Sequence, residues 1–248
     1  MRYNKKNSKE AITMEMKYKR ILLKLSGEAI SGGSEGIYNY EMIDKICAAI
    51  AKARGVGAEI GIVIGAGNIW RGRSGGSMDR PRADAMGMLA TVMNSFALQD
   101  GFERMGVPAV VLTAVDMPTF GETFTKQNAI HHLTKGRICI FAGGTGRPFF
   151  STDTAAVLRA AEIDADVCLF AKNIDGIYTA DPKTDPTATK YDEITFAEIL
   201  QKNLRAIDLT AAAFCIDAKM NVLAFSLEDP ENILRALRGE NVGTVIHN

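Results

Sequence analysis

Glycine-rich segments with nearby cations and hydroxyl groups are the features of this sequence best suited to chemistry. Four of them stand out, at residues 24–27, 65–72, 143–153 and 172–182. Glycines let backbone N–H groups approach a phosphate closely, and a helix that begins just beyond them adds partial positive charge. Lys24 and Arg71 come from two different segments. We therefore expect two cations to converge on phosphate groups.

The segment 143–153 is the most specific of the four, because it reads Gly-Gly-Thr-Gly-Arg-Pro-Phe-Phe-Ser-Thr-Asp. Its backbone and hydroxyl donors could bind one nucleotide monophosphate, while Phe149 and Phe150 could support a base or a sugar. The closing Ser-Thr-Asp run predicts the N-cap of a helix. A capped turn with core aromatic residues is the alternative, but it leaves the preceding Gly-Thr-Gly-Arg-Pro unexplained.

Individual side chains are open to more than one interpretation. Lys24 alone would be a solvated lysine at a strand end, but its place among four glycine-rich segments favours phosphate binding. Asp84 could accept hydrogen bonds from a ribose, or it could be an acidic residue favoured near a helix N-terminus. Both interpretations fit the local pattern. Met86, Met88 and Met93 are predicted to pack in the core.

The composition excludes several classes of protein. Lys+Arg and Asp+Glu each number 29, so there is no overall positive field of the kind that non-specific nucleic-acid binding needs. The motif G-x-x-x-x-G-K-[ST] is absent, which excludes a P-loop. The histidines and the scattered cysteines lack the spacing of a zinc site, and the cysteines are expected to be buried thiols.

A serine hydrolase is a second possibility, because residues 32–36 and 72–76 match G-x-S-x-G. The nucleophile and its partners would come from Ser34, Ser74, Asp116, His131 and His132. A nucleophile elbow places the serine on a tight turn directly between a strand and a helix. Both serines lie several residues beyond the predicted strands, so the hydrolase interpretation is disfavoured.

The start of the chain and its apolar runs bear on location. The first 19 residues are basic and polar, without the apolar block of a signal peptide. No stretch is apolar for long enough to span a bilayer. We expect a cytoplasmic protein that needs no membrane contact, with a flexible extension at residues 1–17 and a single domain at residues 18–248.

Short β-branched runs alternate with longer helical patterns after that extension. Strands are predicted at residues 20–25, 59–64, 109–112, 137–141, 166–170 and 222–225. Helices are predicted at residues 40–53, 83–104, 126–133, 154–163, 196–201, 211–219 and 231–237. This alternation is typical of an α/β fold whose mostly parallel central sheet is covered on both faces. Since such sheets bind ligands at the carboxyl ends of their strands, the glycine-rich segments are expected to meet there.

Motifs in the glycine-rich segments and in one predicted helix carry a family resemblance. They are Lys-Leu-Ser-Gly-Glu-Ala at 24–29, Gly-Met-Leu-Ala-Thr-Val-Met-Asn at 87–94, Thr-Gly-Arg-Pro-Phe-Phe-Ser-Thr-Asp at 145–153 and Asp-Gly-Ile-Tyr-Thr-Ala-Asp-Pro at 175–182. In this order they resemble the bacterial-type uridylate kinases of the amino-acid kinase superfamily. Gly-Met-Leu-Ala-Thr and Gly-x-Pro-Phe-Phe separate that branch from the kinases of glutamate, acetylglutamate, aspartate and carbamate.

The resemblance implies a three-layer αβα sandwich that transfers a phosphoryl group from ATP to UMP, giving ADP and UDP for pyrimidine nucleotide biosynthesis. Mg²⁺ would be held by the ATP phosphates without a direct protein ligand. The acceptor phosphate has a second pKa of about 6, so it is already mostly ionised at neutral pH and needs no general base. The catalytic residues would be Lys24, Arg71, Asp153 and Asp208.

The resemblance also assigns residues to each nucleotide. ATP would contact Lys24, Leu25, Ser26, Gly27, Gly67, Arg71, Lys172, Asn173, Tyr178 and Asp181. UMP would contact Ala66, Asp84, Thr145, Gly146, Arg147, Pro148, Phe149, Phe150, Ser151 and Thr152. Lys24 and Arg71 would offset charge on the moving phosphoryl group, and Asp153 would orient Lys24 or a metal-bound water.

Assembly and regulation are implied in the same way. The resembled family is typically hexameric, and many members are activated by GTP and inhibited by UTP. The activator region would comprise Gly32, Gly33, Ser34, Glu35, Gly36 and Ile37. Two alternatives fit the same motifs. One is a related kinase that acts on a carboxylate or carbamate, and the other is a non-catalytic relative that stores anions or responds to nucleotides.

Overall fold

Residues 16–32, 36–70, 77–204 and 206–248 are described in a computed structural model of the protein. All six predicted strands form, as β1 (Arg20–Leu25), β2 (Glu59–Ile64), β3 (Ala109–Thr113), β5 (Ile138–Ala142), β6 (Val167–Lys172) and β10 (Val222–Ser226). Five further strands were not predicted, namely β4 (Glu122–Thr123), β7 (Ile177–Tyr178), β8 (Lys190–Tyr191), β9 (Glu193–Thr195) and β11 (Gly243–His247).

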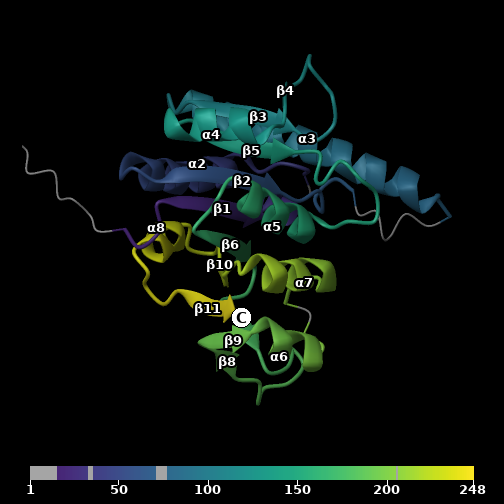
Figure 1. The fold of residues 1–248 in the computed structure, drawn as a ribbon, viewed down its shortest axis with the longest axis vertical. Helices are drawn as coiled ribbons and strands as arrows, with labels where there is room; N and C mark the ends of the chain where they lie inside the picture. Colours follow the sequence, from purple (N-terminus) through teal and green to yellow (C-terminus); the bar gives the residue numbers. More distant parts are fainter. Residues whose placement is uncertain (1–15, 33–35, 71–76, 205) are drawn as a thin grey trace, which may run out of the picture.

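One nine-stranded sheet runs through the described part of the chain, in the order β4-β3-β5-β2-β1-β6-β10-β11-β9. Figure 1 follows this order from β4 at the top to β9 near the bottom. Neighbouring strands are parallel except for the antiparallel pair β10 and β11. The hairpin β7–β8 forms a separate two-stranded sheet. The predicted mostly parallel sheet is confirmed.

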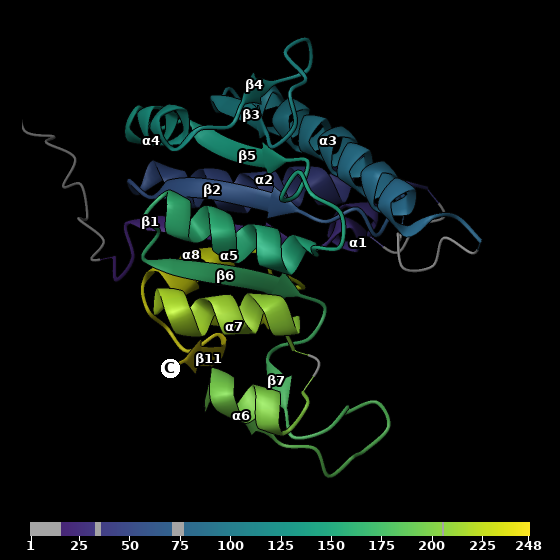
Figure 2. The same cartoon turned by 45° about the vertical axis from the view of Figure 1, so that its right-hand side comes forward.

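Helices cover both faces of this sheet. They are α1 (Gly27–Ser31), α2 (Tyr40–Gly55), α3 (Arg80–Arg104), α4 (Lys126–Thr134), α5 (Thr152–Glu162), α6 (Phe196–Gln201), α7 (Leu209–Ala218) and α8 (Asn232–Leu237). One apolar core lies between the sheet and α2, α3 and α8, and a second lies under α4 to α7. Figure 2 shows α5 and α7 passing in front of the sheet. The three-layer architecture is therefore confirmed.

Strand β1 illustrates why these residues form a strand buried on both sides. Ile21 and Leu23 are fully buried in the core under α2, while Leu22 is fully buried in the opposite core. Successive side chains of a strand point to opposite faces, so a continuous apolar run serves both cores at once.

The parallel register brings the carboxyl ends of the central strands to one edge of the sheet. Leu25 at the end of β1 pairs with Ile64 at the end of β2, and Lys172 at the end of β6 pairs with Ser226. The four glycine-rich segments follow β1, β2, β5 and β6. As predicted, they leave the sheet at the same edge.

The prediction that Met86 and Met93 pack in the core is wrong. Their exposed fractions are 40% and 50%. Helix α3 buries the face that carries Ala90, Asn94 and Leu98, which turns the two methionines outward.

The four cysteines are buried free thiols, as the sequence predicts. None of the helices in the described ranges has the length and apolar character needed to cross a bilayer.

Candidate active site

Three segments that are distant in the sequence meet at Gly65, directly after β2. A Cβ atom placed on Gly65 would lie 3.3 Å from the backbone nitrogen of Gly27 and 3.5 Å from Oγ1 of Thr152. These neighbours belong to the segment after β1 and to the start of α5. The predicted meeting of separate glycine-rich segments is therefore found in the structure.

Gly27 is required by the close approach of two of these segments. A Cβ atom there would lie 2.5 Å from Oδ1 of Asn68, 2.6 Å from the nitrogen of Gly67 and 2.9 Å from the oxygen of Gly65. Real Cβ atoms essentially never come so near to other heavy atoms. Only glycine lets the start of α1 lie directly on the turn at residues 65–68.

Lys24 is not a solvated lysine at a strand end. Its Nζ atom lies 2.8 Å from Oδ1 of Asp153, and the two side chains are only 13% and 18% exposed. Asp153 lies in the first turn of α5, where Ser151 caps the helix by accepting hydrogen bonds from the backbone N–H groups of Asp153 and Thr154. The predicted N-cap thus fixes the carboxylate that holds Lys24.

Lys172 joins this charge cluster at the end of β6. Its Nζ atom donates a hydrogen bond to the carbonyl oxygen of Ala206. The Nζ atoms of Lys24 and Lys172 lie 5.8 Å and 5.9 Å from the centre of the same Phe170 ring. The structure thus places Lys172, one of the predicted ATP residues, near Lys24.

The ionisation of these groups follows from burial and from their mutual charges. Burial would raise the pKa of Asp153, but the neighbouring Lys24 and Lys172 oppose it and hold that pKa below its ordinary value. Burial lowers the pKa of Lys172, an effect that Asp153 partly offsets. Two partly buried lysines therefore act on one carboxylate at this point.

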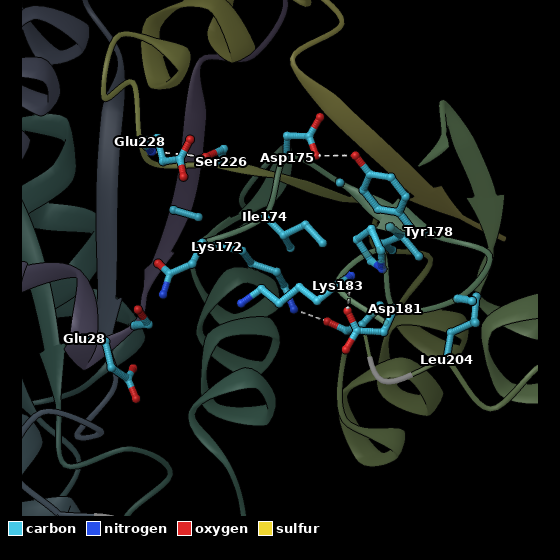
Figure 3. A pocket seen from close by; sticks show the side chains of 18 of the residues that line it. Glu28, Lys172, Ile174, Asp175, Tyr178, Asp181, Lys183, Leu204, Ser226 and Glu228 are labelled. Atoms are coloured by element: carbon cyan, nitrogen blue, oxygen red, sulfur yellow. Dashed lines mark hydrogen bonds between the residues drawn. The ribbon is translucent and has the colours of Figure 1, made fainter. Parts of the chain in front are cut away.

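The larger of two cavities here has a volume of about 1050 Å³. Six of the predicted ATP residues line it: Lys24, Ser26, Lys172, Asn173, Tyr178 and Asp181. Figure 3 shows Lys172, Tyr178 and Asp181 around this cavity, with the Tyr178 hydroxyl donating to Asp175 at 2.8 Å. The side chain of Leu25 is fully buried in the core instead, so only its backbone could contact ATP.

The smaller cavity has a volume of about 340 Å³. Seven of the predicted UMP residues line it: Ala66, Asp84, Thr145, Arg147, Phe150, Ser151 and Thr152. Gly67, predicted for ATP, lines it as well. Gly146, Pro148 and Phe149 do not line it. Gly146 instead forms the turn, with a φ of 73° and a Cβ position only 2.8 Å from the oxygen of Ala114.

Asp84 is anchored to the loop of the smaller cavity. Its Oδ2 atom accepts hydrogen bonds from Nε of Arg80 at 2.7 Å and from the backbone N–H of Phe149 at 2.8 Å. Phe149 has a φ of 73°, which is strained for a residue with a side chain, and its ring is exposed below Arg80. Asp84 lies beyond the first turn of α3, so the helix-dipole interpretation is not supported.

Sequence reasoning missed several residues of the smaller cavity, namely Trp70, Arg80, Gly87, Met88, Thr91 and Gly144. The spacing of Asp84, Gly87, Met88 and Thr91 on one helix face was the available signal. Thr91 also holds the loop, because its Oγ1 atom accepts from the backbone N–H of Gly143 at 2.9 Å.

Asp208 is the N-cap of α7 and ties that helix to α5. Its carboxylate accepts hydrogen bonds from the backbone N–H of Ala211 at 3.0 Å, from Oγ1 of Thr154 at 3.1 Å and from Oγ of Ser151. These contacts support a role in positioning the start of α5, and with it Asp153.

Some predicted residues cannot be placed. Arg71, Gly33, Ser34, Glu35 and Ser74 lie outside the described residues. Within the activator region that was predicted, Gly32 ends α1 with a φ of 59°, and the carbonyl oxygen of Ile37 accepts a hydrogen bond from Asn68 at 2.9 Å.

The pattern of strands, glycine turns and a partly buried lysine–aspartate pair agrees with a known family. The model of the amino acid kinase family matches residues 19–226. The chain belongs to the amino acid kinase family. The matched residues include both cavities' glycine turns and the Lys24–Asp153 pair.

Solved structures of the same family are close in fold. A UMP kinase from Bacillus anthracis is 34% identical, with a TM-score of 0.90 over 93% of this chain and 96% of that one. A UMP kinase from Ureaplasma parvum is 35% identical, with a TM-score of 0.89 over 94% of this chain and 100% of that one. A uridylate kinase from Archaeoglobus fulgidus is 28% identical, with a TM-score of 0.68 over 91% and 99%.

Proposed function

We propose that this protein is a UMP kinase, which transfers the terminal phosphoryl group of ATP to UMP and yields ADP and UDP for pyrimidine nucleotide biosynthesis. One observation carries the proposal: residues that flank the contact between Gly27 and Gly65 line two cavities of unequal size. Ser26 and Glu28 line the larger, and Ala66 and Gly67 line the smaller. The larger suits a nucleoside triphosphate and the smaller a monophosphate. The similarity to two UMP kinases at 34% and 35% identity supports the same acceptor.

The residues of the charge cluster account for the chemistry. A UMP phosphate oxygen is already ionised at neutral pH, so the site needs positioning and charge stabilisation rather than a general base. Lys24 and Lys172 supply positive charge where charge develops on the transferred group. Asp153 holds Lys24 in place. Arg71 remains a predicted further cation.

Magnesium fits this site through the nucleotide. Among the residues that the structure describes, no group of three or more His, Cys, Asp or Glu side chains could hold a metal ion. Asp153 is engaged with Lys24. Mg²⁺ usually binds substrate phosphates together with water and few carboxylates, and there it neutralises phosphate charge. The proposal therefore takes Mg²⁺ as part of the ATP complex.

Recognition of the two nucleosides is assigned by the cavity linings. Tyr178, Asn173 and Asp181 are proposed to contact the adenosine of ATP, since they line the larger cavity. Asp84 and Phe150 are proposed to contact the ribose and uracil of UMP, and Thr145, Arg147 and Thr152 its phosphate.

Release of ADP, measured by a coupled assay with Mg²⁺-ATP and a panel of acceptors, tests the proposal. UMP should give rapid turnover, with CMP slower and acetylglutamate, glutamate, aspartate and carbamate inactive. Turnover with an amino acid or carbamate alone would replace the proposal by a related kinase. Binding of ATP and UMP without turnover would instead indicate a non-catalytic relative.

The proposal includes a cytoplasmic homohexamer that responds to GTP and UTP. Exposed Met86, Leu89 and Met93 recur on one face of α3 and supply apolar surface for contact between subunits. The buried free cysteines agree with a reducing compartment. Light scattering after size-exclusion chromatography tests the assembly, and rates measured with added GTP or UTP test the regulation.

A further inference from the structure

A closed pair of amide side chains lies beneath the turn at residues 65–68. Asn94 is fully buried on α3. Its Nδ2 atom donates hydrogen bonds to the carbonyl oxygen of Gly65 at 2.7 Å and to Oδ1 of Asn68 at 2.8 Å. Asn68 donates in return from Nδ2 to Oδ1 of Asn94 at 3.1 Å and to the oxygen of Ile37 at 2.9 Å. Both amide nitrogens therefore use both of their N–H groups.

The orientation of both amides follows from their partners. Each Nδ2 atom faces a backbone carbonyl oxygen, which can only accept a hydrogen bond. A buried amide without partners is costly, whereas a fully paired one restricts the surrounding structure to a single arrangement. Asparagine also has low helix propensity in the middle of a helix such as α3. The burial of Asn94 thus points to a role in fixing its partners.

Those partners belong to the turn between the two cavities. Gly65, held by Asn94, begins the turn, and Ala66 accepts backbone hydrogen bonds from Ile69 at 2.9 Å and Trp70 at 2.8 Å. A Cβ atom placed on Gly27, the last residue of the segment 24–27, would lie 2.5 Å from Oδ1 of Asn68. The amide pair therefore sets the distance between the turn at 65–68 and the segment that carries Lys24.

We infer that Asn94 and Asn68 are positioning residues for phosphoryl transfer. They hold the turn at 65–68 against Gly27 so that its backbone and Lys24 face the same phosphates. This inference rests on the proposed UMP kinase function. A displacement of about 1 Å in a positioned group can lower a rate by about a hundredfold. The effect is therefore expected on turnover more than on nucleotide affinity.

Steady-state kinetics of Asn94→Asp and Asn68→Ala test the inference. The aspartate keeps the size of Asn94 but sets an oxygen against the oxygen of Gly65. Both variants should lower kcat by roughly ten- to a hundredfold, with smaller changes in KM for ATP and UMP. The matched control is Ser95→Ala, because Ser95 is equally buried on α3 and, among the described residues, donates to the carbonyl oxygen of Thr91 on its own helix. It should keep kcat within about twofold.

A double variant separates positioning from general loss of stability. Asn68→Ala combined with Asn94→Asp should be no slower than the slower single variant, because either change already opens the pair. Multiplied losses in the double variant would overturn the inference. So would a kcat within about twofold of the unchanged protein in both single variants. If Asn94→Asp does not fold, the kcat of Asn68→Ala alone tests the inference, and a value within about twofold of the unchanged protein overturns it.

Hydrogen exchange provides a readout that does not depend on activity. In the free protein, amides of residues 65–70 should exchange faster in Asn68→Ala and Asn94→Asp than in the unaltered protein, while amides of α2 should keep their exchange rates. In Ser95→Ala, exchange at residues 65–70 should stay unchanged. Unchanged exchange at 65–70 would overturn the inference even in an active enzyme. If the unaltered protein fails to phosphorylate UMP but the exchange result holds, the proposed function fails and the role of the pair in holding the turn stands.

Discussion

The Nζ atom of Lys24 lies 2.8 Å from Oδ1 of Asp153, and this ion pair joins β1 to the first turn of α5. Lys172 lies close enough to lower the pKa of the same carboxylate. Two lysine side chains therefore share one carboxylate. A partly buried ion pair of this kind holds the lysine side chain in one position. Removing either partner is costly, because it leaves the other charge without a partner.

Replacement of Lys24 by alanine should lower kcat by about a hundredfold or more, as loss of a preorganised charge donor commonly does. Steady-state rates with saturating ATP and UMP measure the effect. Lys45→Ala is the control, since Lys45 is exposed on α2 and pairs only with Glu41 in the part of the chain described. Unchanged turnover in Lys24→Ala would remove Lys24 from the catalytic centre.

Acid should weaken the fold partly through Asp153. Its pKa is lowered in the folded protein from an ordinary value of 3.8, so its ionised form contributes stability above that pH. The contribution is lost as the pH falls through 3.8 toward the folded pKa. Thermal melts from neutral pH to about 3 should show that the unaltered protein has a higher melting temperature than Asp153→Asn, and that this difference becomes smaller at acid pH. A difference in melting temperature that is independent of pH would contradict the lowered pKa.

The sequence was sufficient to predict six strands of the sheet, because their apolar runs fill both cores, as Ile21, Leu22 and Leu23 do. The strands β7, β8 and β4 have only two residues each, too few for a periodic pattern. The strand β11 was also missed, because its pairing with β10 and β9 is a long-range contact.

Candidate site residues were predictable where glycine and charge marked a strand end, as at Lys24 and Gly27. The amide pair of Asn94 and Asn68 was not predicted, because neither side chain reveals its partner until the two elements pack together. Met86 was assigned to the core because the sequence alone did not show which face of α3 packs on the sheet.

Gly27→Ala should reduce kcat/KM for ATP by roughly a hundredfold, since the added methyl group would push the two glycine segments apart. The same assay applied to Gly55→Ala provides a matched control. A Cβ atom on Gly55, at the end of α2, would meet nothing within 4 Å. Equal kinetics for both variants would show that the contact between Gly27 and Gly67 is not needed.

Asp84→Asn should raise KM for UMP roughly tenfold, which corresponds to one lost hydrogen bond to a charged group. The loop at Phe149 loses its charged acceptor, and KM for ATP should change little. Asp100→Asn is the control, because Asp100 forms a similar ion pair with Arg104 on the same helix, outside both cavities. A rise in KM for ATP alone would refute the assignment of Asp84 to the acceptor side.

The central claim is that the donor and acceptor cavities meet at the glycine turns beside Lys24. An inhibitor in which adenosine and uridine are joined through their 5′ oxygens by a polyphosphate chain tests this claim most directly. Inhibition kinetics should show competition with both ATP and UMP, together with binding tighter than that of either nucleotide alone. Competition with only one of the two substrates would contradict a shared phosphate site.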